Sequence, residues 1–168
     1  MTTQEPIVEK ESKLITLWSI KLKTGQHLIS ELYDAEYTQE TLMMVNPLII
    51  EILNTNNGEM TTARPYDVTT DEEIFEIQPN QFVSKPQTVN EFYREFYVKA
   101  LMFNYVKEAR KSFERNAISN PLNAVLESTE MEKYLATVSV FLEERFGIEL
   151  NVNTSAEHFH MPASRTLH

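Results

Sequence analysis

Short runs of aliphatic, β-branched and aromatic residues alternate with polar breaks over the first half of the chain. Runs of this kind, bounded by Gly, Pro and Asn, are typical of β-strands. They occupy residues 14–22, 27–33, 41–45, 48–53, 60–63, 74–77 and 81–84. Gly25 and the stretch 54–58 supply residues that adopt positive φ at hairpin loops, and Asn46-Pro47 predicts a bend between two runs. Five or six short strands in about 70 residues predict a small, strongly bent antiparallel β-barrel over residues 14–86.

Beyond Pro86 the period of the apolar positions changes from two to about 3.6, which is typical of a helix. Two rows of apolar and aromatic residues follow this period. They are Val89, Phe92, Phe96, Ala100, Phe103, Val106 and Phe113 in one row, and Tyr93, Tyr97, Leu101 and Tyr105 in the other. The rows predict a long helix over residues 88–117. Asn120-Pro121 fits a second helix start, residues 129–132 have capping-box spacing and Gly147 fits a helix end, so one or two further helices follow.

The fold class predicted from these patterns is α+β, with a helical extension at residues 87–150 after the barrel. Residues 1–13 and 151–168 show no sustained periodicity and are expected to be flexible tails. The apolar surface of the long helix is wider than one small barrel face would cover, which predicts packing on more than one neighbour.

A contact between copies of the chain is expected for two reasons. Exposed barrel edges favour pairing with another chain, because their backbone hydrogen-bonding groups have no partner. The long helix also carries aromatic residues that exceed what one barrel face would bury. The candidate interface residues are Phe92, Tyr93, Phe96 and Tyr97.

The amino-acid composition limits the cellular compartment and the kinds of functional site that the chain is expected to have. The chain has no cysteine, which excludes disulfides, Cys-type zinc sites and thiol catalysis and fits a reducing compartment. No signal-peptide pattern and no run of about 20 apolar residues occurs, so a cytoplasmic location without membrane contact is expected. A net charge of −10 opposes broad, non-specific binding of nucleic acid.

A basic cluster late in the long helix is the candidate nucleic-acid site. Lys107, Arg110, Lys111 and Arg115 lie there with Tyr105 among them, as in a phosphate-binding stripe with a stacking ring. The same arrangement follows from the helix macrodipole, because bases near a helix end and acids near its start are each stabilising. Both explanations remain open from the sequence.

Other motifs point to no cofactor, no metal and no catalytic residue. His158 and His160 are too few for a zinc site without cysteine, and a solvated tail explains them better. His27 and Asp34 lie far apart along one extended strand, which argues against an acid–base pair. The three glycines occur in no phosphate-binding motif, and the acidic run from Asp67 to Glu73 lacks the calcium-loop pattern.

Residues 20–32 and 41–48 carry a likeness to a known family. The turn glycine Gly25, the long second strand and the step Asn46-Pro47-Leu48 resemble the opening of an Sm-like barrel, as found in divergent Sm-like proteins of tailed marine phages. The likeness covers about residues 17–84. It implies a ring built by pairing of strand edges and, in many relatives, an RNA-binding pore. Tyr37 and Thr41 stand where RNA-binding members carry Asp and Asn, and Pro79-Asn80 lacks the usual basic step.

The function expected from this resemblance is that of a non-enzymatic, Sm-like, oligomer-forming protein of phage origin in the host cytoplasm, in contact with RNA or DNA. The alternative is a viral structural or assembly module that docks on phage or host proteins without binding nucleic acid. An enzyme is the third hypothesis, since a fold alone does not fix function.

Overall fold

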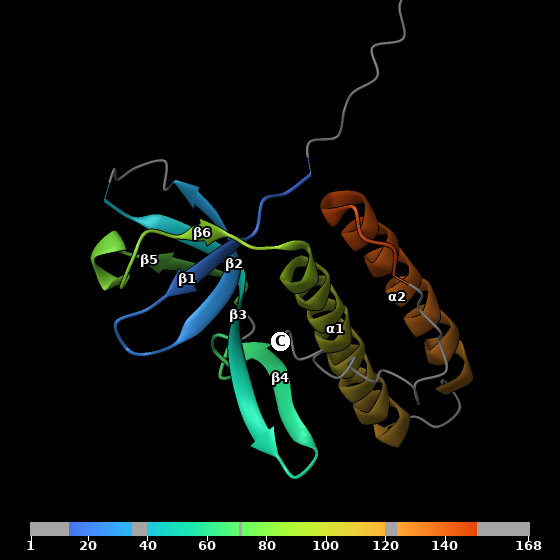
Figure 1. The fold of residues 1–168 in the computed structure, drawn as a ribbon. Coiled ribbons are helices and arrows are strands. Elements are labelled where there is room, and N and C mark those ends of the chain that lie inside the picture. The colour runs from blue at the N-terminus through green and yellow to red at the C-terminus, as the bar shows by residue number, and fades with distance from the viewer. Residues whose placement is uncertain (1–13, 35–39, 71, 120–123, 151–168) are drawn as a thin grey trace, which may run out of the picture.

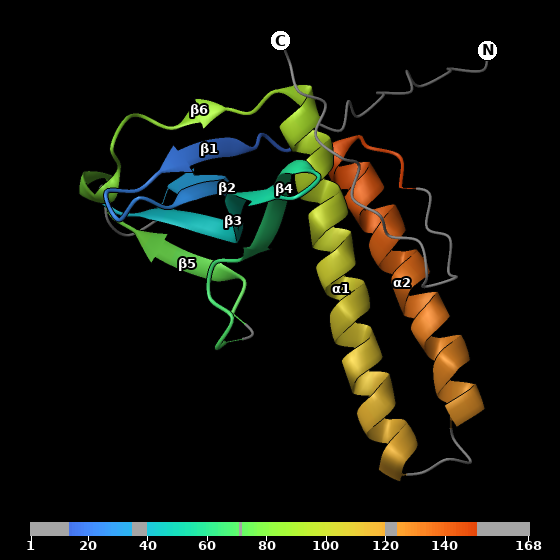
Figure 2. The same cartoon turned by 60° about the horizontal axis from the view of Figure 1, so that its bottom comes forward.

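The computed structural model describes residues 14–34, 40–70, 72–119 and 124–150 of the 168-residue chain. An antiparallel sheet is followed by a hairpin of two long helices that stands against one face of the sheet (Figures 1 and 2). The elements are β1 (Trp18–Lys21), β2 (His27–Asp34), β3 (Leu42–Thr55), β4 (Gly58–Pro65), β5 (Ile74–Ile77), the 3-10 turn η1 (Pro79–Gln81), β6 (Gln87–Thr88), α1 (Glu91–Ser119) and α2 (Ala124–Phe146). The predicted α+β class is confirmed.

The six strands form an open sheet, so the predicted barrel is wrong. The strand order is β4-β3-β2-β1-β6, and β5 pairs with β3 beside β4. A strand expected at residues 81–84 is replaced by the η1 turn and a single bridge between Leu22 and Phe82. Pro79 opens that turn, and Pro86 lacks the N–H that a longer β6 would need. Only the two residues of β6 therefore pair with β1, and they do not close the sheet.

The bend at Asn46-Pro47 is confirmed, but the two runs beside it form one long strand. Asn46 has a φ of 50°, and the register of the β2–β3 ladder shifts between Ile29 and Glu31, opposite the bend. Before the bend β3 lies between β2 and β5, and beyond it β3 pairs with β4 from Leu48 to Thr55. The bend thus sends the β3–β4 hairpin away from the rest of the sheet (Figure 1).

Both faces of the sheet are covered. The curve of the sheet encloses one apolar cluster, Ile20, Leu22, Leu28, Met44, Ile49, Ile77 and Phe82. A second cluster joins the other face to the helices. It contains Leu17, Ile29, Leu48 and Ile50 from the sheet side and Phe96, Tyr97, Val98, Leu101, Met102, Leu135, Leu142 and Phe146 from the helices. The expectation that the long helix packs on more than one neighbour is confirmed, since α1 contacts both the sheet and α2.

The second helix is one continuous element whose C-terminal end is bound by α1 and by the segment before β1. Arg94 of α1 donates from Nε and Nη2 to the carbonyl of Phe146 and from Nη1 to the carbonyl of Ile15. The amide of Ile15 donates to the carbonyl of Arg145. Because the last carbonyls of a helix have no partner within it, these bonds satisfy groups that would otherwise be left unpaired. The expected helix start at Asn120-Pro121 lies outside the described residues.

Gly147 ends α2 as predicted, with a φ of 68° and its amide donating to the carbonyl of Glu143 at 2.8 Å. Replacing it by Ala is expected to lower the free energy of unfolding by about 1–2 kcal/mol, because L-residues with a side chain avoid this backbone region. An added Cβ would also lie 2.8 Å from Cδ1 of Leu14, an exposed side chain that is able to turn away. Urea unfolding measures the loss.

The matched control for this variant is Gly147→Asn, since Asn tolerates positive φ better than Ala but is larger. If backbone conformation sets the cost, Gly147→Asn unfolds at a higher urea concentration than Gly147→Ala. The reverse order would mean that contact with Leu14 sets the cost instead.

Candidate functional site

The basic residues considered for nucleic-acid contact lie near the far end of α1. Lys107, Lys111 and Arg115 are exposed and Arg110 is partly exposed. The Nζ of Lys111 donates to Oε1 of Glu108 at 2.8 Å, and this bond, with the positive charges around it, lowers the pKa of Glu108. Acid and base pairs three residues apart are ordinary on solvated helices. The stripe therefore carries a charge that is partly balanced by acidic neighbours.

Tyr105 lies with the core and not with the basic stripe. Its ring packs against the cluster between the sheet and the helices, and its hydroxyl donates to Oε1 of Glu73 at 3.3 Å. Burial, followed by the charge of Glu73, raises the pKa of Tyr105 to about 12. A ring held in this way is not positioned to stack on a base beside Lys107 or Lys111.

The four aromatic residues considered as an interface divide between core and surface. Phe96 and Tyr97 are buried within this chain, and the hydroxyl of Tyr97 donates to the carbonyl of Asn46 at 2.9 Å. Tyr93 is partly buried against the same core and lies edge-on to the rings of Phe92 and Phe96. Phe92 is the member of the four whose side chain is largely exposed.

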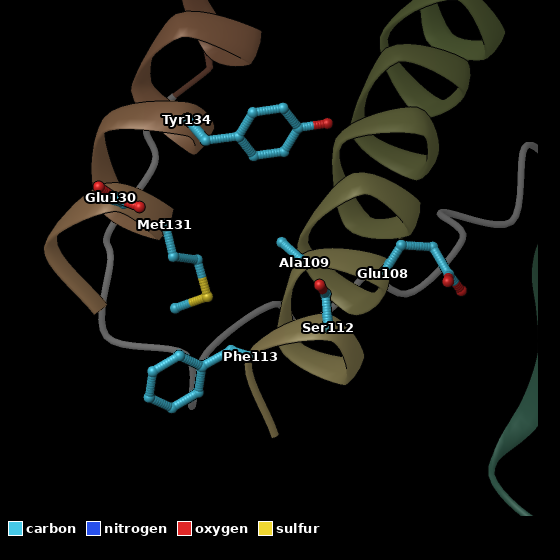
Figure 3. A pocket seen from close by; sticks show the side chains of 7 residues that line it. All are labelled: Glu108, Ala109, Ser112, Phe113, Glu130, Met131 and Tyr134. Atoms are coloured by element: carbon cyan, nitrogen blue, oxygen red, sulfur yellow. The ribbon is translucent and has the colours of Figure 1, made fainter. Parts of the chain in front are cut away.

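A groove of about 400 Å³ opens between the two helices beside the basic stripe (Figure 3). Its apolar lining comes from Ala109, Phe113 and Met131, and the ring of Tyr134 points from α2 towards α1. Ser112 and two carboxylates complete the lining. The lining offers apolar surface and acidic groups, but no histidine or cysteine to activate a nucleophile.

A charged junction between β2 and α2 contains the buried carboxylate of Glu31. Glu31 is 1% exposed, and its Oε2 accepts hydrogen bonds from Nη2 of Arg145 at 2.5 Å and from the hydroxyl of Tyr33 at 2.6 Å. The guanidinium of Arg145 also lies 5.6 Å from the ring centre of Phe141 and 6.0 Å from that of Phe146. The junction ties the last turn of α2 to the middle of the sheet.

The electrostatics of the junction follow from burial and from the Glu31 charge. Burial raises the pKa of Tyr97 well above its usual value, and the neighbouring Glu31 carboxylate adds to that rise. Burial and the hydrogen bond to Glu31 raise the pKa of Tyr33, and the same carboxylate raises the pKa of Arg145. The tyrosines stay neutral and the arginine stays charged across the physiological range, so the junction serves to hold the structure together.

The hydrophobic and polar pattern of the sequence does not identify this junction, although one signal for it is present. Glu31 lies between Ile29 and Tyr33 on the face of β2 that the alternating pattern places towards the core. A lone acidic residue on such a face predicts a basic partner from another element. The partner is 114 residues away along the chain, and no local pattern identifies it.

His27 is the described member of the histidines named in the sequence analysis. His27 Nε2 lies 2.7 Å from the hydroxyl of Ser19, across the β1–β2 ladder, while Asp34 is at the other end of β2. His158 and His160 lie outside the described residues, as do the predicted tails. Within the described ranges, no three His, Asp or Glu side chains are grouped in a way that would hold a metal ion.

The outer part of the β3–β4 hairpin pairs with no third strand among the described residues and has exposed apolar side chains. The ladder with β2 ends at Ile49, so residues 50–55 of β3 pair only with β4 among the described strands. Ile52, Leu53 and Met60 are 60%, 45% and 42% exposed near the tip. We call residues 50–62 the ribbon; Figure 1 shows its tip extending beyond the other strands.

No model of a protein family matches this chain, and no curated protein matches it in sequence. Among the described residues, no helix combines the length and the apolar character needed to cross a membrane.

Proposed function

We propose that this chain is a non-enzymatic, Sm-like protein of phage origin that works in the host cytoplasm by assembling with further copies of itself. The main support for this proposal is the ribbon. Beyond Ile49 its two strands pair only with each other among the described strands, and three of its apolar side chains are exposed. A two-stranded hairpin is marginal by itself, and a free, apolar edge pairs readily with another strand.

The arrangement of the first four strands supports the Sm-like part of the proposal. β1 to β4 follow one another as an antiparallel meander, and the long β3 bends at Asn46-Pro47. The step Asn46-Pro47-Leu48 belongs to the resemblance stated for residues 17–84, whereas the long strand of that resemblance is the second, β2, and here the longer, bent strand is β3. The open sheet also departs from the resemblance, and it leaves β6 at one edge and β4 and β5 at the other for a neighbour to pair with.

The charged groups of the junction support a non-catalytic role. Arg94 and Arg145 each hold α2 to another element, and Glu31 is shielded from solvent by that contact. Catalytic acids and bases need access to a substrate, whereas these groups are committed to partners within the chain.

The proposal is tested by a triple variant of the ribbon, Ile52→Thr, Leu53→Thr and Met60→Thr. Threonine keeps the strand propensity but removes the apolar contact, so the assembled mass is expected to fall to that of one chain while the unfolding midpoint changes little. Light scattering measures the mass. The matched control is Val140→Thr, an equally exposed position on α2, which is expected to keep the assembled mass. Unchanged mass in the triple variant would contradict the proposal.

Nucleic-acid contact is a second candidate, favoured by the exposed bases at the end of α1. Lys107 and Arg110 lie one turn apart there, with Lys111 and Arg115 beside them. Binding of a short uridine-rich RNA that weakens steeply with salt would support this candidate. Assembly without RNA binding would favour the alternative, a structural module that docks on phage or host proteins.

A further inference from the structure

One edge of the sheet carries positive charge and no negative charge. Residues 14–30 and 78–90 contain no Asp or Glu, although the chain has 25 acidic and only 15 basic residues. Their charged side chains are Lys21, Lys23 and Lys85, all exposed. We call these three lysines the basic edge.

Backbone contacts bring the three lysines together at the β6 side of the sheet. The amide of Lys23 donates to the carbonyl of Gln81 at 2.9 Å, and the amide of Val83 donates to the carbonyl of Lys21 at 2.8 Å. Lys85 lies on the short stretch between that contact and β6, which pairs with β1. Val83 is 63% exposed among them.

The local field at the basic edge is positive, as His27 indicates. Burial lowers the pKa of His27, and the positive charge of Lys21 lowers it further. Among the groups that shift this pKa, no acid opposes Lys21. Residues 14–30 and 78–90 thus supply no acidic side chain beside the three lysines.

The opposite edge of the sheet is acidic. Glu72, Glu73 and Glu76 are exposed just before and within β5, and Ile74 between them is 56% exposed. We call the three glutamates the acidic edge. Glu73 accepts a hydrogen bond from the hydroxyl of Tyr105. Figure 2 shows β6 and β5 at opposite edges of the sheet, with β1, β2 and β3 between them.

We infer that the basic edge of one copy docks on the acidic edge of the next copy, with Val83 and Ile74 at the centre of the contact. The inference rests on the proposed function, and it adds which two edges of neighbouring copies meet. Opposite charges around a small apolar centre are the usual anatomy of an interface. Because the two patches lie on different edges, the contact is head-to-tail and repeats, which gives a ring or a filament.

A second copy fits the basic edge better than a nucleic acid does. The matching negative surface is present on the same chain, on the side of the sheet where β5 and β4 both pair with β3 and from which the ribbon extends. Within residues 14–30 and 78–90, Phe82 is buried and Trp18 is partly buried against the core. The basic edge thus lacks the exposed rings on which single-stranded bases stack.

The test uses two charge-reversed variants of the full chain, K21E/K23E and E72K/E76K, measured by light scattering at low salt. Each variant alone is expected to associate at least about tenfold more weakly than the unchanged chain, because like charges then face each other. An equimolar mixture is expected to regain the mass, since every contact in an alternating assembly again joins opposite charges. K107E/K133E has the same net charge as K21E/K23E and is expected to keep the assembled mass.

The outcomes separate this inference from the proposed function. An unchanged chain that assembles while both reversed variants assemble equally well would overturn the inference and leave the proposed function standing. An unchanged chain that stays a monomer would overturn the proposed function itself. If K21E/K23E assembles normally but loses binding to a labelled uridine-rich RNA, the basic edge is a nucleic-acid site and the inference fails.

Discussion

Replacing Arg145 by Met is expected to lower the free energy of unfolding by about 3 kcal/mol, because Glu31 would then carry an unpaired charge in the core. Glu31 is 1% exposed, and Arg145 is the basic residue that pairs with it. Arg145 itself is about one-third exposed, so the expected loss lies near the lower end for a broken buried pair. Urea unfolding at neutral pH, followed by far-UV circular dichroism, measures it.

The double variant Glu31→Met, Arg145→Met provides the control, because it removes both charges and keeps the volume. A buried ion pair is often replaced by apolar residues at little net cost, so the double variant is expected to regain most of the stability that Arg145→Met loses. A single variant that loses less than about 1 kcal/mol would contradict the account, since that is the size expected for an exposed pair.

Replacing Phe146 by Ala is expected to lower the free energy of unfolding by about 3–5 kcal/mol, the range for removing a buried ring. The ring of Phe146 is fully buried and lies edge-on to Tyr97 at 5.9 Å between centroids. The guanidinium groups of Arg94 and Arg145 lie 5.8 and 6.0 Å from its centroid. Its loss therefore leaves a cavity where α1, α2 and the sheet meet, and urea unfolding measures the cost.

Phe141→Ala is the matched control for this variant. Phe141 also lies under Arg145, at 5.6 Å, but it is 54% exposed, so its removal is expected to cost less than about 1 kcal/mol. Equal losses for the two variants would mean that the packing of Phe146 between the helices and the sheet is not what holds the helical hairpin in place.

The local features of the fold were predictable from the sequence because they depend on neighbouring residues. Pro and Asn at the bend, the positive φ at Gly25 and Gly58, and the end of α2 at Gly147 all follow from local backbone preference. Closure of the sheet into a barrel could not be predicted from local sequence patterns, because closure depends on which distant strands pair. Here no described pairing joins β6 or β1 to β4 or β5, so the sheet stays open.

The candidate sites show the same contrast between features set by neighbouring residues, which the sequence predicts, and features set by distant residues, which it does not. Periodicity identified the apolar rows of α1, but it does not say what covers each row, and Phe96 and Tyr97 are buried against this chain's own sheet and α2. The junction of Glu31 with Arg145, and the two charged edges of the sheet, each join residues far apart in the sequence. Such groupings become visible only when the topology is known.

The most direct test of the account is the mass of the unchanged full chain in solution, measured by light scattering over a range of concentrations. Assembly through the ribbon and the sheet edges predicts a mass that is a multiple of the 19.6 kDa chain and that falls when salt screens the charged edges. A mass of one chain at every concentration would contradict the central claim that this protein works by assembling with copies of itself.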